Sequence, residues 1–308
     1  MTGWNATRIP DQSGRTAVVT GANSGIGYVT ARELARCGAT VVLACRSAAR
    51  GRAAAQRLRD EVPGAQAGFA ELDLASLDSV REFARAFTRD HRTLDLLVNN
   101  AGVMALPYGR TADGFETQFG VNHLGHFALT GLLLPGLLAA APGARIVNVS
   151  SGFHVLGRPD GPFESAENGY RRWTAYGRSK TANLLFTHEL ARRLTASGSP
   201  VTAAAAHPGY ASTNLHAGAA ALEGHGIGSR VMALGNAVLA QPAASGALPT
   251  LYAATAPGVA QDGFFGPRLG WRGAPVRSWR AGWTLDDTAG ERLWATSEKL
   301  TGVTYPAP

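Results

Sequence analysis

The fold is decided by the stretch Thr16-Ala17-Val18-Val19-Thr20-Gly21-Ala22-Asn23-Ser24-Gly25-Ile26-Gly27. A short apolar, β-prone run ends at Thr20, and a helical segment is expected from Ile26 to Cys37. Glycines between a strand and a helix permit a tight turn, and they let a pyrophosphate approach the unpaired N–H groups of the helix N-terminus. The spacing G-x-x-x-G-x-G departs from the more familiar G-x-G-x-x-G fingerprint, but its place after the first strand still predicts phosphate binding. The expected contacts are Gly21, Asn23, Ser24, Gly25, Ile26 and Gly27.

The same alternation of strand and helix continues along the chain. Further strands are expected at 40–44, 66–72, 94–98, 145–149 and 201–206, and further helices at 48–62, at 77–90 after Ser76 as N-cap, at 115–134 and around Tyr176. Parallel neighbours need a crossover connection, so strands alternating with helices form βαβ units. We therefore predict an α/β fold for residues 1–308 as a single domain. It is a doubly wound, Rossmann-like parallel sheet with six strands buried on both faces and helices on both sides.

The composition is typical of a soluble globular protein. Of the 308 residues, 45% are hydrophobic and 17% are charged, which is enough for a sizeable core. The net charge of +7 is spread over the chain without a nucleic-acid-binding motif, so we expect no nucleic-acid partner. The two cysteines, Cys37 and Cys45, lie beside expected core elements, which argues against a disulfide framework and a zinc site.

The sequence predicts no membrane-spanning segment. Residues 1–13 are polar and hold no apolar core of a signal peptide. The longest later apolar run, 127–141, is interrupted by Pro135 and Gly136 and falls short of the roughly 20 residues that a span needs. We therefore expect a cytoplasmic protein without a membrane partner.

A second informative stretch, Tyr176-Gly177-Arg178-Ser179-Lys180, places a phenol and an ammonium on one face of a helix. Lys180 and Lys299 are the only lysines among 29 Lys and Arg residues. A chain that otherwise uses Arg has a Lys here, a compact cation whose pKa can move. Taken alone, a Y-x-x-x-K match is most often a surface Tyr and a solvated Lys, so its weight depends on the other motifs.

The end of the second strand predicts which dinucleotide binds. An NAD site offers an acidic side chain to the ribose hydroxyls, whereas an NADP site needs a cation for the 2′-phosphate. The stretch 44–50 holds no carboxylate, and Arg46 is able to bind a phosphate bidentately. NADP(H) is therefore the expected cofactor, with Arg46 as the main contact and Arg50 as a weaker candidate.

Polar residues follow the other strands. Asp73 and Leu74 are placed to meet an adenine edge, and Asn100, at the end of the fourth strand, is expected to hydrogen-bond backbone or cofactor. The further cofactor candidates are Ala101, Gly102, Pro208, Gly209 and Thr213.

Several motifs, in this order, resemble those of the short-chain dehydrogenase/reductase family over about residues 14–215. They are T-G-A-N-S-G-I-G, D-L, N-N-A-G, V-N-H at 121–123, V-S-S at 149–151, Y-x-x-x-K and A-H-P-G at 206–209. Within the family the chain is similar to the retinol-dehydrogenase-like branch, in a soluble, bacterial-type form. That similarity is carried by the stretches 43–46 and 119–127 and by a long insertion at about 152–174.

The resemblance implies hydride transfer between a nicotinamide and a carbonyl or alcohol, with Tyr176 as general acid or base. It implies that Lys180 lowers the pKa of the phenol and hydrogen-bonds the nicotinamide ribose, so both residues also bind cofactor. Ser151 would orient the substrate oxygen, with Ser150 as its rival. Asn122 would bind a water that passes protons to Lys180, or else hold backbone at a helix kink.

The substrate side is less defined. Its expected walls are the insertion at 152–174, a lid at about 210–240 and the segment 104–108. The expected substrate is a small apolar or aromatic carbonyl compound. His154 and His216 are candidates for the pocket lining, no metal site is expected, and the four tryptophans within 263–308 are expected to pack in the core. A non-catalytic NADP(H) sensor and an epimerase or dehydratase using the same tyrosine are the alternative functions. Homo-oligomers through the helices carrying Asn122 and Tyr176 are a further expectation from the resemblance.

Overall fold

The sheet contains eight strands in the part of the chain that the structure, a computed structural model, describes: residues 3–140, 142–209 and 241–306. Their spatial order is β3-β2-β1-β4-β5-β6-β7-β8. The strands are β1 (Thr16–Thr20), β2 (Thr40–Cys45), β3 (Ala67–Glu71), β4 (Leu96–Asn99), β5 (Arg145–Val149), β6 (Thr202–Ala206), β7 (Gly263–Pro267) and β8 (Pro275–Arg277). All neighbouring pairs are parallel except β7 and β8.

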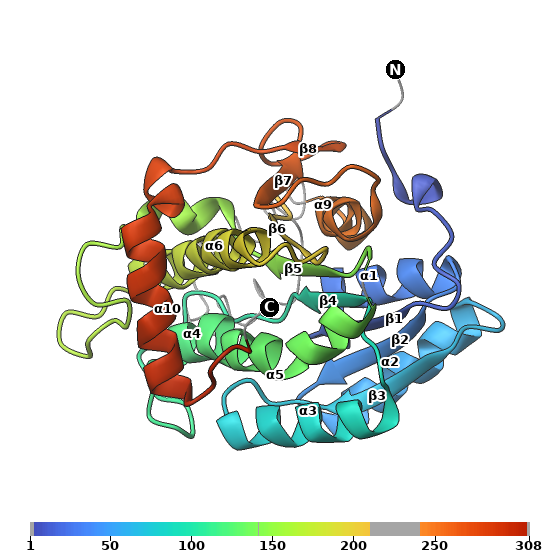
Figure 1. The fold of residues 1–308 in the computed structure, drawn as a ribbon, viewed down its shortest axis with the longest axis horizontal. Helices are drawn as coiled ribbons and strands as arrows, with labels where there is room; N and C mark the ends of the chain where they lie inside the picture. The colour runs from blue at the N-terminus through green and yellow to red at the C-terminus, as the bar shows by residue number, and fades with distance from the viewer. Residues whose placement is uncertain (1–2, 141, 210–240, 307–308) are drawn as a thin grey trace, which may run out of the picture.

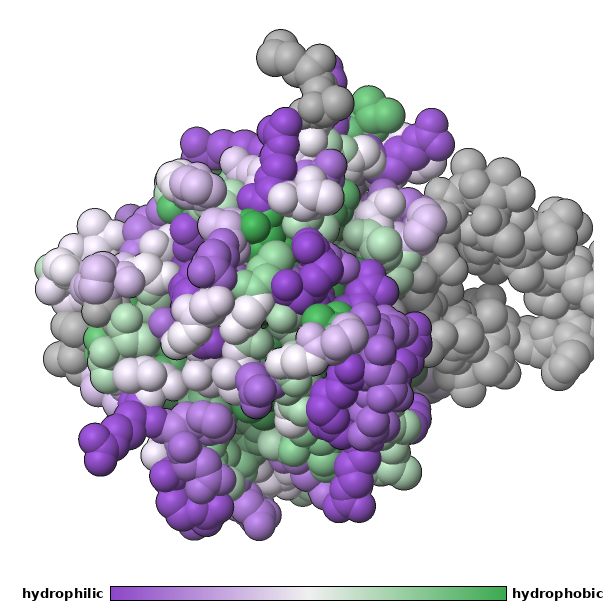
Figure 2. All heavy atoms as spheres, turned by 90° about the vertical axis from the view of Figure 1, so that its right-hand side faces the viewer, coloured by the Kyte–Doolittle hydropathy of each residue, from purple (hydrophilic) through white to green (hydrophobic). Residues whose placement is uncertain are grey.

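Helices cover both faces of this sheet (Figure 1). The main ones are α1 (Gly25–Arg36), α2 (Ala48–Glu61), α3 (Leu77–Asp90), α5 (Gly125–Ala140), α6 (Arg172–Ala196), α9 (Ala243–Thr255) and α10 (Asp287–Thr301). Successive residues of β1 alternate between two cores: Ala17 and Val19 pack with α1, α2 and α9, whereas Val18 packs with α3, α5 and α6. The doubly wound, Rossmann-like fold is thereby confirmed. Figure 2 shows the side nearest β1, β2 and α1, where hydrophilic side chains are spread with apolar ones between them.

The six predicted strands all form, but the prediction that all are buried on both faces is wrong for β3. That strand is half exposed, because it lies at the edge of the sheet and pairs only with β2. The strands β7 and β8 were not predicted. The sequence of β7, Gly-Phe-Phe-Gly-Pro, is rich in residues that disfavour strands, and its pairing with β6 and β8 makes it one.

The helix expected at 115–134 differs from the prediction at both ends. It begins with the short α4 (Thr117–Phe119), passes through a π-helical turn, η2 (Gly120–Leu124), and continues as α5 past Pro135 to Ala140. The whole stretch, Thr117–Ala140, is long and apolar enough to cross a membrane by length and composition, with 67% of its most apolar window buried inside the protein. The sequence argument did not predict this stretch, because it counted Pro135 as an interruption, whereas the helix continues past that residue.

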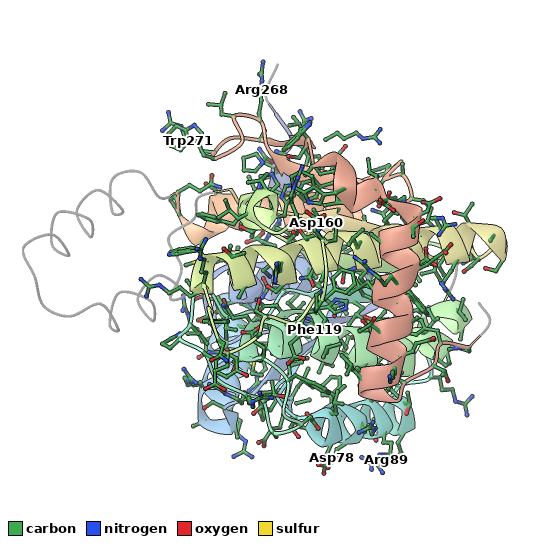
Figure 3. The ribbon with its side chains drawn as sticks, turned by 90° about the vertical axis from the view of Figure 1, so that its left-hand side faces the viewer. Asp78, Arg89, Phe119, Asp160, Arg268 and Trp271 are labelled. Atoms are coloured by element: carbon green, nitrogen blue, oxygen red, sulfur yellow. The ribbon has the colours of Figure 1, made fainter. Side chains whose placement is uncertain are left out.

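The C-terminal helix α10 lies across α6 and α5 (Figure 3). The Trp294 ring is 5.2 Å from that of Phe127 on α5 and 4.4 Å from that of Tyr305, so the end of the chain is anchored in the core. Core packing is therefore confirmed for Trp294. It is wrong for Trp279, which is 72% exposed, and for Trp271, which points outward from the loop between β7 and β8 (Figure 3).

Candidate active site

The phosphate turn between β1 and α1 presents free N–H groups. Ser24 stands at the N-cap of α1 but makes no side-chain capping bond, whereas Ser47 and Ser76 cap α2 and α3. The first amides of α1 are therefore available to an anion, at the end of the helix where the dipole favours negative charge. Gly27 has to be a glycine here, because a Cβ would come within 2.5 Å of the Asn100 Nδ2 atom.

Thr20 joins this turn to the end of β4. Its hydroxyl oxygen accepts the N–H groups of Asn100 and Ala101, each at 2.9 Å, and Asn100 Nδ2 donates to the Thr20 carbonyl at 2.8 Å. The predicted residue Asn100 thus holds the turn in place with its side chain. The two strand ends form one rigid floor.

His126 on α5 completes this floor. Its Nδ1 lies 3.1 Å from the carbonyl oxygen of Asn122, which can only accept, so Nδ1 carries the proton. Burial lowers the pKa of His126 to about 4, so the ring is neutral, and Nε2 accepts from the Thr20 hydroxyl at 2.9 Å. Sequence reasoning missed Thr20 and His126 as positioning residues. The one available signal was that Thr20 ends a buried strand directly before the glycine turn.

The other predicted cofactor residues line the same edge of the sheet. Arg46 is exposed directly after β2 and forms no ion pair with any residue the structure describes. The Asp73 carboxylate accepts the N–H of Ala75 at 3.0 Å, and Leu74 is buried against α5. Gly209, at φ +67°, donates its N–H to His207 Nδ1 at 3.2 Å.

The loop after β6 is held at one further point, where Pro208 accepts a hydrogen bond from Gln241 at 2.6 Å. Thr213, His216 and the expected lid at 210–240 lie outside the described residues.

Tyr176 and Lys180 are both buried on α6, with 6% and 4% of their surfaces exposed. The Lys180 Nζ atom donates to the carbonyl of Val149 at 3.1 Å and lies 5.8 Å from the centre of the Tyr176 ring. Burial lowers the pKa of Lys180 to about 8 and raises that of Tyr176 to about 12. The sequence argument expected Lys180 to depress the pKa of the phenol. In the structure the cost of burying a phenolate is the larger effect, and a hydrogen bond with Ser151 is what opposes it.

The two serines after β5 have different partners. Ser150 is buried and donates its hydroxyl to the carbonyl of Lys180 at 2.8 Å, which fixes α6 against the strand end. Ser151 opposes the effect of burial on the pKa of Tyr176, and its hydroxyl oxygen accepts the N–H of Phe153 at 3.2 Å. Of the two, Ser151 is therefore the serine beside the phenol.

Asn122 lies in the π-helical turn and clamps a neighbouring segment. Its amide oxygen accepts from Val103 N at 2.7 Å, while Nδ2 donates to Val103 O and to Ser179 Oγ, each at 2.9 Å. These are the contacts of the structural alternative, a residue that holds backbone at a kink. A Cβ at Gly102 would lie 3.1 Å from Asn122 Oδ1 and 3.3 Å from Lys180 Nζ. Because Gly102 has no side chain, these two groups can both lie close to its backbone.

His154 was expected to line the substrate pocket, and the structure buries its side chain against backbone groups. It is 2% exposed in η3 (Gly152–Leu156), where its Nδ1 donates to the Ser151 carbonyl at 2.7 Å and its Nε2 accepts the N–H of Ala281 at 3.1 Å. It thus holds the backbone of Ser151. Across the described residues, no three His, Cys, Asp or Glu side chains gather in a way that could hold a metal ion.

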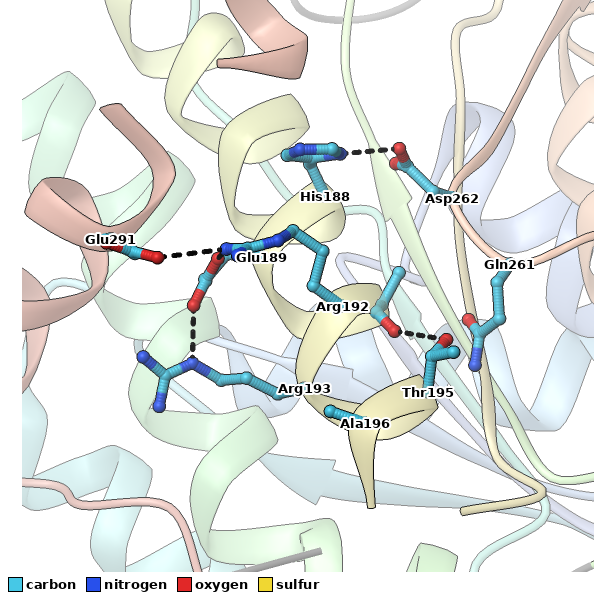
Figure 4. Close-up of a pocket in the computed structure, with 10 residues that line it drawn as sticks. His188, Glu189, Arg192, Arg193, Thr195, Ala196, Gln261, Asp262 and Glu291 are labelled. Atoms are coloured by element: carbon cyan, nitrogen blue, oxygen red, sulfur yellow. Dashed lines mark hydrogen bonds and ion pairs between the residues drawn. The ribbon is translucent and has the colours of Figure 1, made fainter. Parts of the chain in front are cut away.

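A cavity of about 540 Å³ lies away from this site (Figure 4). It is lined by the C-terminal half of α6, by Gln261 and Asp262 before β7, and by Glu291 of α10. Arg192 is 16 residues from Tyr176 along α6, which corresponds to about 24 Å. The charged side chains that line the cavity pair with one another. Arg193, for example, forms an ion pair with Glu189 at 2.7 Å. The cavity is therefore no part of the candidate active site.

Comparison with known proteins agrees with this geometry. Residues 15–223 match the short chain dehydrogenase family. The chain is 43% identical to Homo sapiens retinol dehydrogenase 13 over 300 residues, which is 96% of this chain and 86% of that protein. It is 52% identical to Mus musculus retinol dehydrogenase 12 over 196 residues, 64% of this chain, and spans 61% of the length of that relative.

Solved structures give the same result. An uncharacterised protein from Mycobacterium paratuberculosis is similar at a TM-score of 0.80 and 45% identity, over 99% of this chain and 100% of that one. An NAD(P)-dependent gluconate 5-dehydrogenase from Beutenbergia cavernae with bound NADP is similar at a TM-score of 0.64 and 26% identity, over 83% of this chain and 96% of that one. The chain belongs to the short chain dehydrogenase family of oxidoreductases, in its retinol-dehydrogenase-like branch.

Proposed function

We propose that this protein is an NADP(H)-dependent oxidoreductase that moves hydride between the nicotinamide and a carbonyl or alcohol of a small apolar compound. The observation that carries the proposal is the buried pair of Tyr176 and Lys180 beside Ser151, at the sheet edge where the phosphate turn also lies. Tyr176 acts as the general acid or base on the substrate oxygen, and Ser151 orients that oxygen. The relatives named as retinol dehydrogenases support an alcohol and aldehyde couple.

Several features fit a bound dinucleotide. The N-terminus of α1, which has no side-chain cap, suits the pyrophosphate. Arg46, which is exposed and forms no ion pair with a described residue, suits the 2′-phosphate that distinguishes NADP from NAD. An ammonium has three donors, and the described part of the chain supplies an acceptor for one of those of Lys180, at Val149. The remaining donors suit the ribose hydroxyls. When bound, the nicotinamide supplies or accepts the hydride.

The protonated state of the Tyr176 phenol supports reduction as the direction of the reaction. Because burial raises the pKa of Tyr176 to about 12, the group carries its proton at neutral pH and is ready to donate it to a carbonyl oxygen. Asn122 acts through position, by holding the segment at Val103 against α6 beside Lys180.

The setting of the protein is also part of the proposal. We place it in the cytoplasm without a membrane partner, since its long apolar helix is mostly buried. The net charge of +7, spread over the chain without a nucleic-acid-binding motif, argues against a nucleic-acid partner. Any homo-oligomer has to use a surface other than the part of α5 and α6 that α10 covers.

The proposal is tested by following NADPH oxidation with a panel of ketones and aldehydes. Wild-type protein should oxidise NADPH with at least one of them, and Tyr176→Phe should lower kcat about a hundred- to ten-thousandfold, the usual contribution of a general acid. Tyr176→Phe should still bind NADPH, which a fluorescence titration checks. Equal turnover by the two proteins would refute the role of Tyr176, and tight NADPH binding without any reduction would favour a sensor.

A further inference from the structure

Two half-exposed aromatic rings lie beside the phenol of Tyr176. Phe153 follows Ser151 by two residues in η3, and Trp173 precedes Tyr176 by three residues in the first turn of α6. Their ring centres are 5.1 Å apart, and each side chain is 37% exposed. The Tyr176 ring lies 6.1 Å from that of Phe153 and 6.5 Å from that of Trp173. The two rings therefore share one aromatic cluster with the candidate catalytic group.

The position of this pair is fixed by a close approach of backbones. A Cβ at Gly177 would meet the carbonyl oxygen of Phe153 at 2.8 Å and the nitrogen of Gly157 at 3.1 Å. Leu156 Cβ would lie 3.0 Å from the same position, so the 3₁₀ turn η3 packs closely against α6 at Gly177. This close packing holds the turn that carries Phe153 next to the helix that carries Trp173 and Tyr176.

The apolar surface extends beyond the two rings. Val155 and Leu156 of the same turn are 40% and 47% exposed, which with Phe153 and Trp173 gives four exposed apolar side chains, here called the ring patch. Grouped apolar side chains at a surface commonly mark a binding site. Because the Ser151 hydroxyl and the Tyr176 phenol lie at its margin, the occupant that fits is a substrate whose oxygen reaches those groups and whose uncharged body covers the rings.

Building on the proposed function, we propose that Phe153 and Trp173 form the specificity wall of the active site and favour carbonyl compounds whose carbonyl is attached to a planar aromatic ring. Aromatic rings gain from edge-to-face or offset contact with other rings beyond simple burial of apolar area. A saturated ring of the same carbon number keeps the apolar area and lacks the π face. The pair therefore discriminates by ring type, and aliphatic side chains at these two positions would remove the discrimination.

The test compares benzaldehyde with cyclohexanecarbaldehyde, which have the same carbon skeleton, as substrates for NADPH-dependent reduction. The preference, measured as the ratio of the two kcat/KM values, should fall roughly two- to tenfold in Phe153→Leu and in Trp173→Leu, the range that one ring–ring contact produces. Trp173→Phe keeps a ring and should retain the preference. Trp271→Leu is the matched control, because Trp271 is 38% exposed and points outward from the loop between β7 and β8 (Figure 3). Thermal unfolding checks that each variant is folded.

The contrary outcomes separate the two claims. A wild type that reduces both aldehydes, with variants that keep the wild-type preference or lose both activities equally, would overturn the specificity wall and leave the proposed function intact. A wild type that binds NADPH and reduces neither aldehyde would count against both.

Discussion

Lys180 and Tyr176 show how burial sets the protonation of an active-site pair. Removing water disfavours the charged form of each group, so the ammonium becomes more acidic while the phenol becomes less so. At neutral pH both groups keep a proton, since the two pKa values are about 8 and about 12. The protein alone thus keeps the Tyr176 phenol protonated, which is the state that the proposed reduction of a carbonyl requires.

Titration of Lys180 tests this account of burial. The chain has two lysines, so Lys299→Arg leaves Lys180 as the only lysine, and selective ¹³C labelling of lysine gives a single side-chain set of NMR signals. These signals should titrate with a midpoint near pH 8 in the protein without cofactor. A midpoint close to about 10.4, the value of a solvated lysine, would show that water reaches the ammonium and that burial does not set its pKa.

Arg46 is predicted to determine the choice of dinucleotide. Arg46→Asp replaces a phosphate-binding cation with an anion that repels the 2′-phosphate, so NADPH binding should weaken about ten- to a hundredfold while NADH binding changes little. Titration of both cofactors against wild type and variant by calorimetry measures the effect. Arg50→Asp, four residues further on in α2, is the matched control and should have a smaller effect. If Arg46→Asp weakens the binding of NADPH and NADH equally, Arg46 does not distinguish the two cofactors by the 2′-phosphate.

Single residues of the site were predictable to different degrees. The placement of Tyr176 and Lys180 on one helix, and of the glycines in one turn between β1 and α1, follows from spacing, because it depends on local geometry alone. The contact of Thr20 with His126 does not, since their hydrogen bond joins positions 106 residues apart in the sequence. The partners of Ser150 and Ser151 also depend on how α6 packs, and sequence alone cannot supply that packing.

Among the helices, α6 is held in its C-terminal half by two carboxylates that contact His188, an arrangement here called the clamp. The two ring nitrogens lie 2.7 Å from Asp262, before β7, and 2.8 Å from Asp287, the first residue of α10. Contacting both carboxylates requires a doubly protonated ring, and its hydrogen bond with Asp262 is the main reason that the pKa of His188 is raised. Arg280 and Arg192 also pair with these two carboxylates and complete the charges that face the clamp.

The clamp predicts a pH dependence of stability. Because the pKa of His188 in the folded protein lies above its usual 6.5, its stabilising contribution is complete below about pH 6.5 and is lost as pH rises through the folded-state value. Burial lowers the pKa of the other described buried histidines, such as His207, and they act with the opposite sign. Chemical denaturation of wild type and His188→Gln across this range isolates the effect. The stability difference between the two proteins should shrink as pH rises, and a difference independent of pH would contradict the clamp.

At the same scale, the elements that sequence predicted well were those with local signals. Ser76 caps α3 as expected, and β1 and β5 have their predicted bounds. The π-helical turn and the passage of α5 through Pro135 were missed, because tertiary contacts stabilise both against local preference. The strand β7 was missed for the same reason, since its partner β6 is distant in sequence.

At the scale of the whole molecule, the C-terminal segment of the chain packs over helices α5 and α6. Trp294 of α10 and Tyr305 form an aromatic cluster with Phe127 of α5 and Phe186 of α6, and the Tyr305 hydroxyl donates to the Phe127 carbonyl at 2.7 Å. The C-terminal segment therefore stabilises α5, which directly follows the turn with Asn122, and α6, which carries Tyr176. No sequence motif predicted this arrangement, because it depends on the packing of residues that lie more than a hundred positions apart.

The central claim is that the molecule transfers hydride from a nicotinamide to a carbonyl carbon, with the proton coming from Tyr176. It is tested by supplying NADPH that carries deuterium at its transferable position and analysing the alcohol product by mass spectrometry and NMR. One deuterium on the carbinol carbon of the product, formed rapidly by wild type and about a hundred- to ten-thousandfold more slowly by Tyr176→Phe, is the predicted result. A converted substrate that contains no deuterium would contradict the account, because the chemistry would then be proton transfer or elimination.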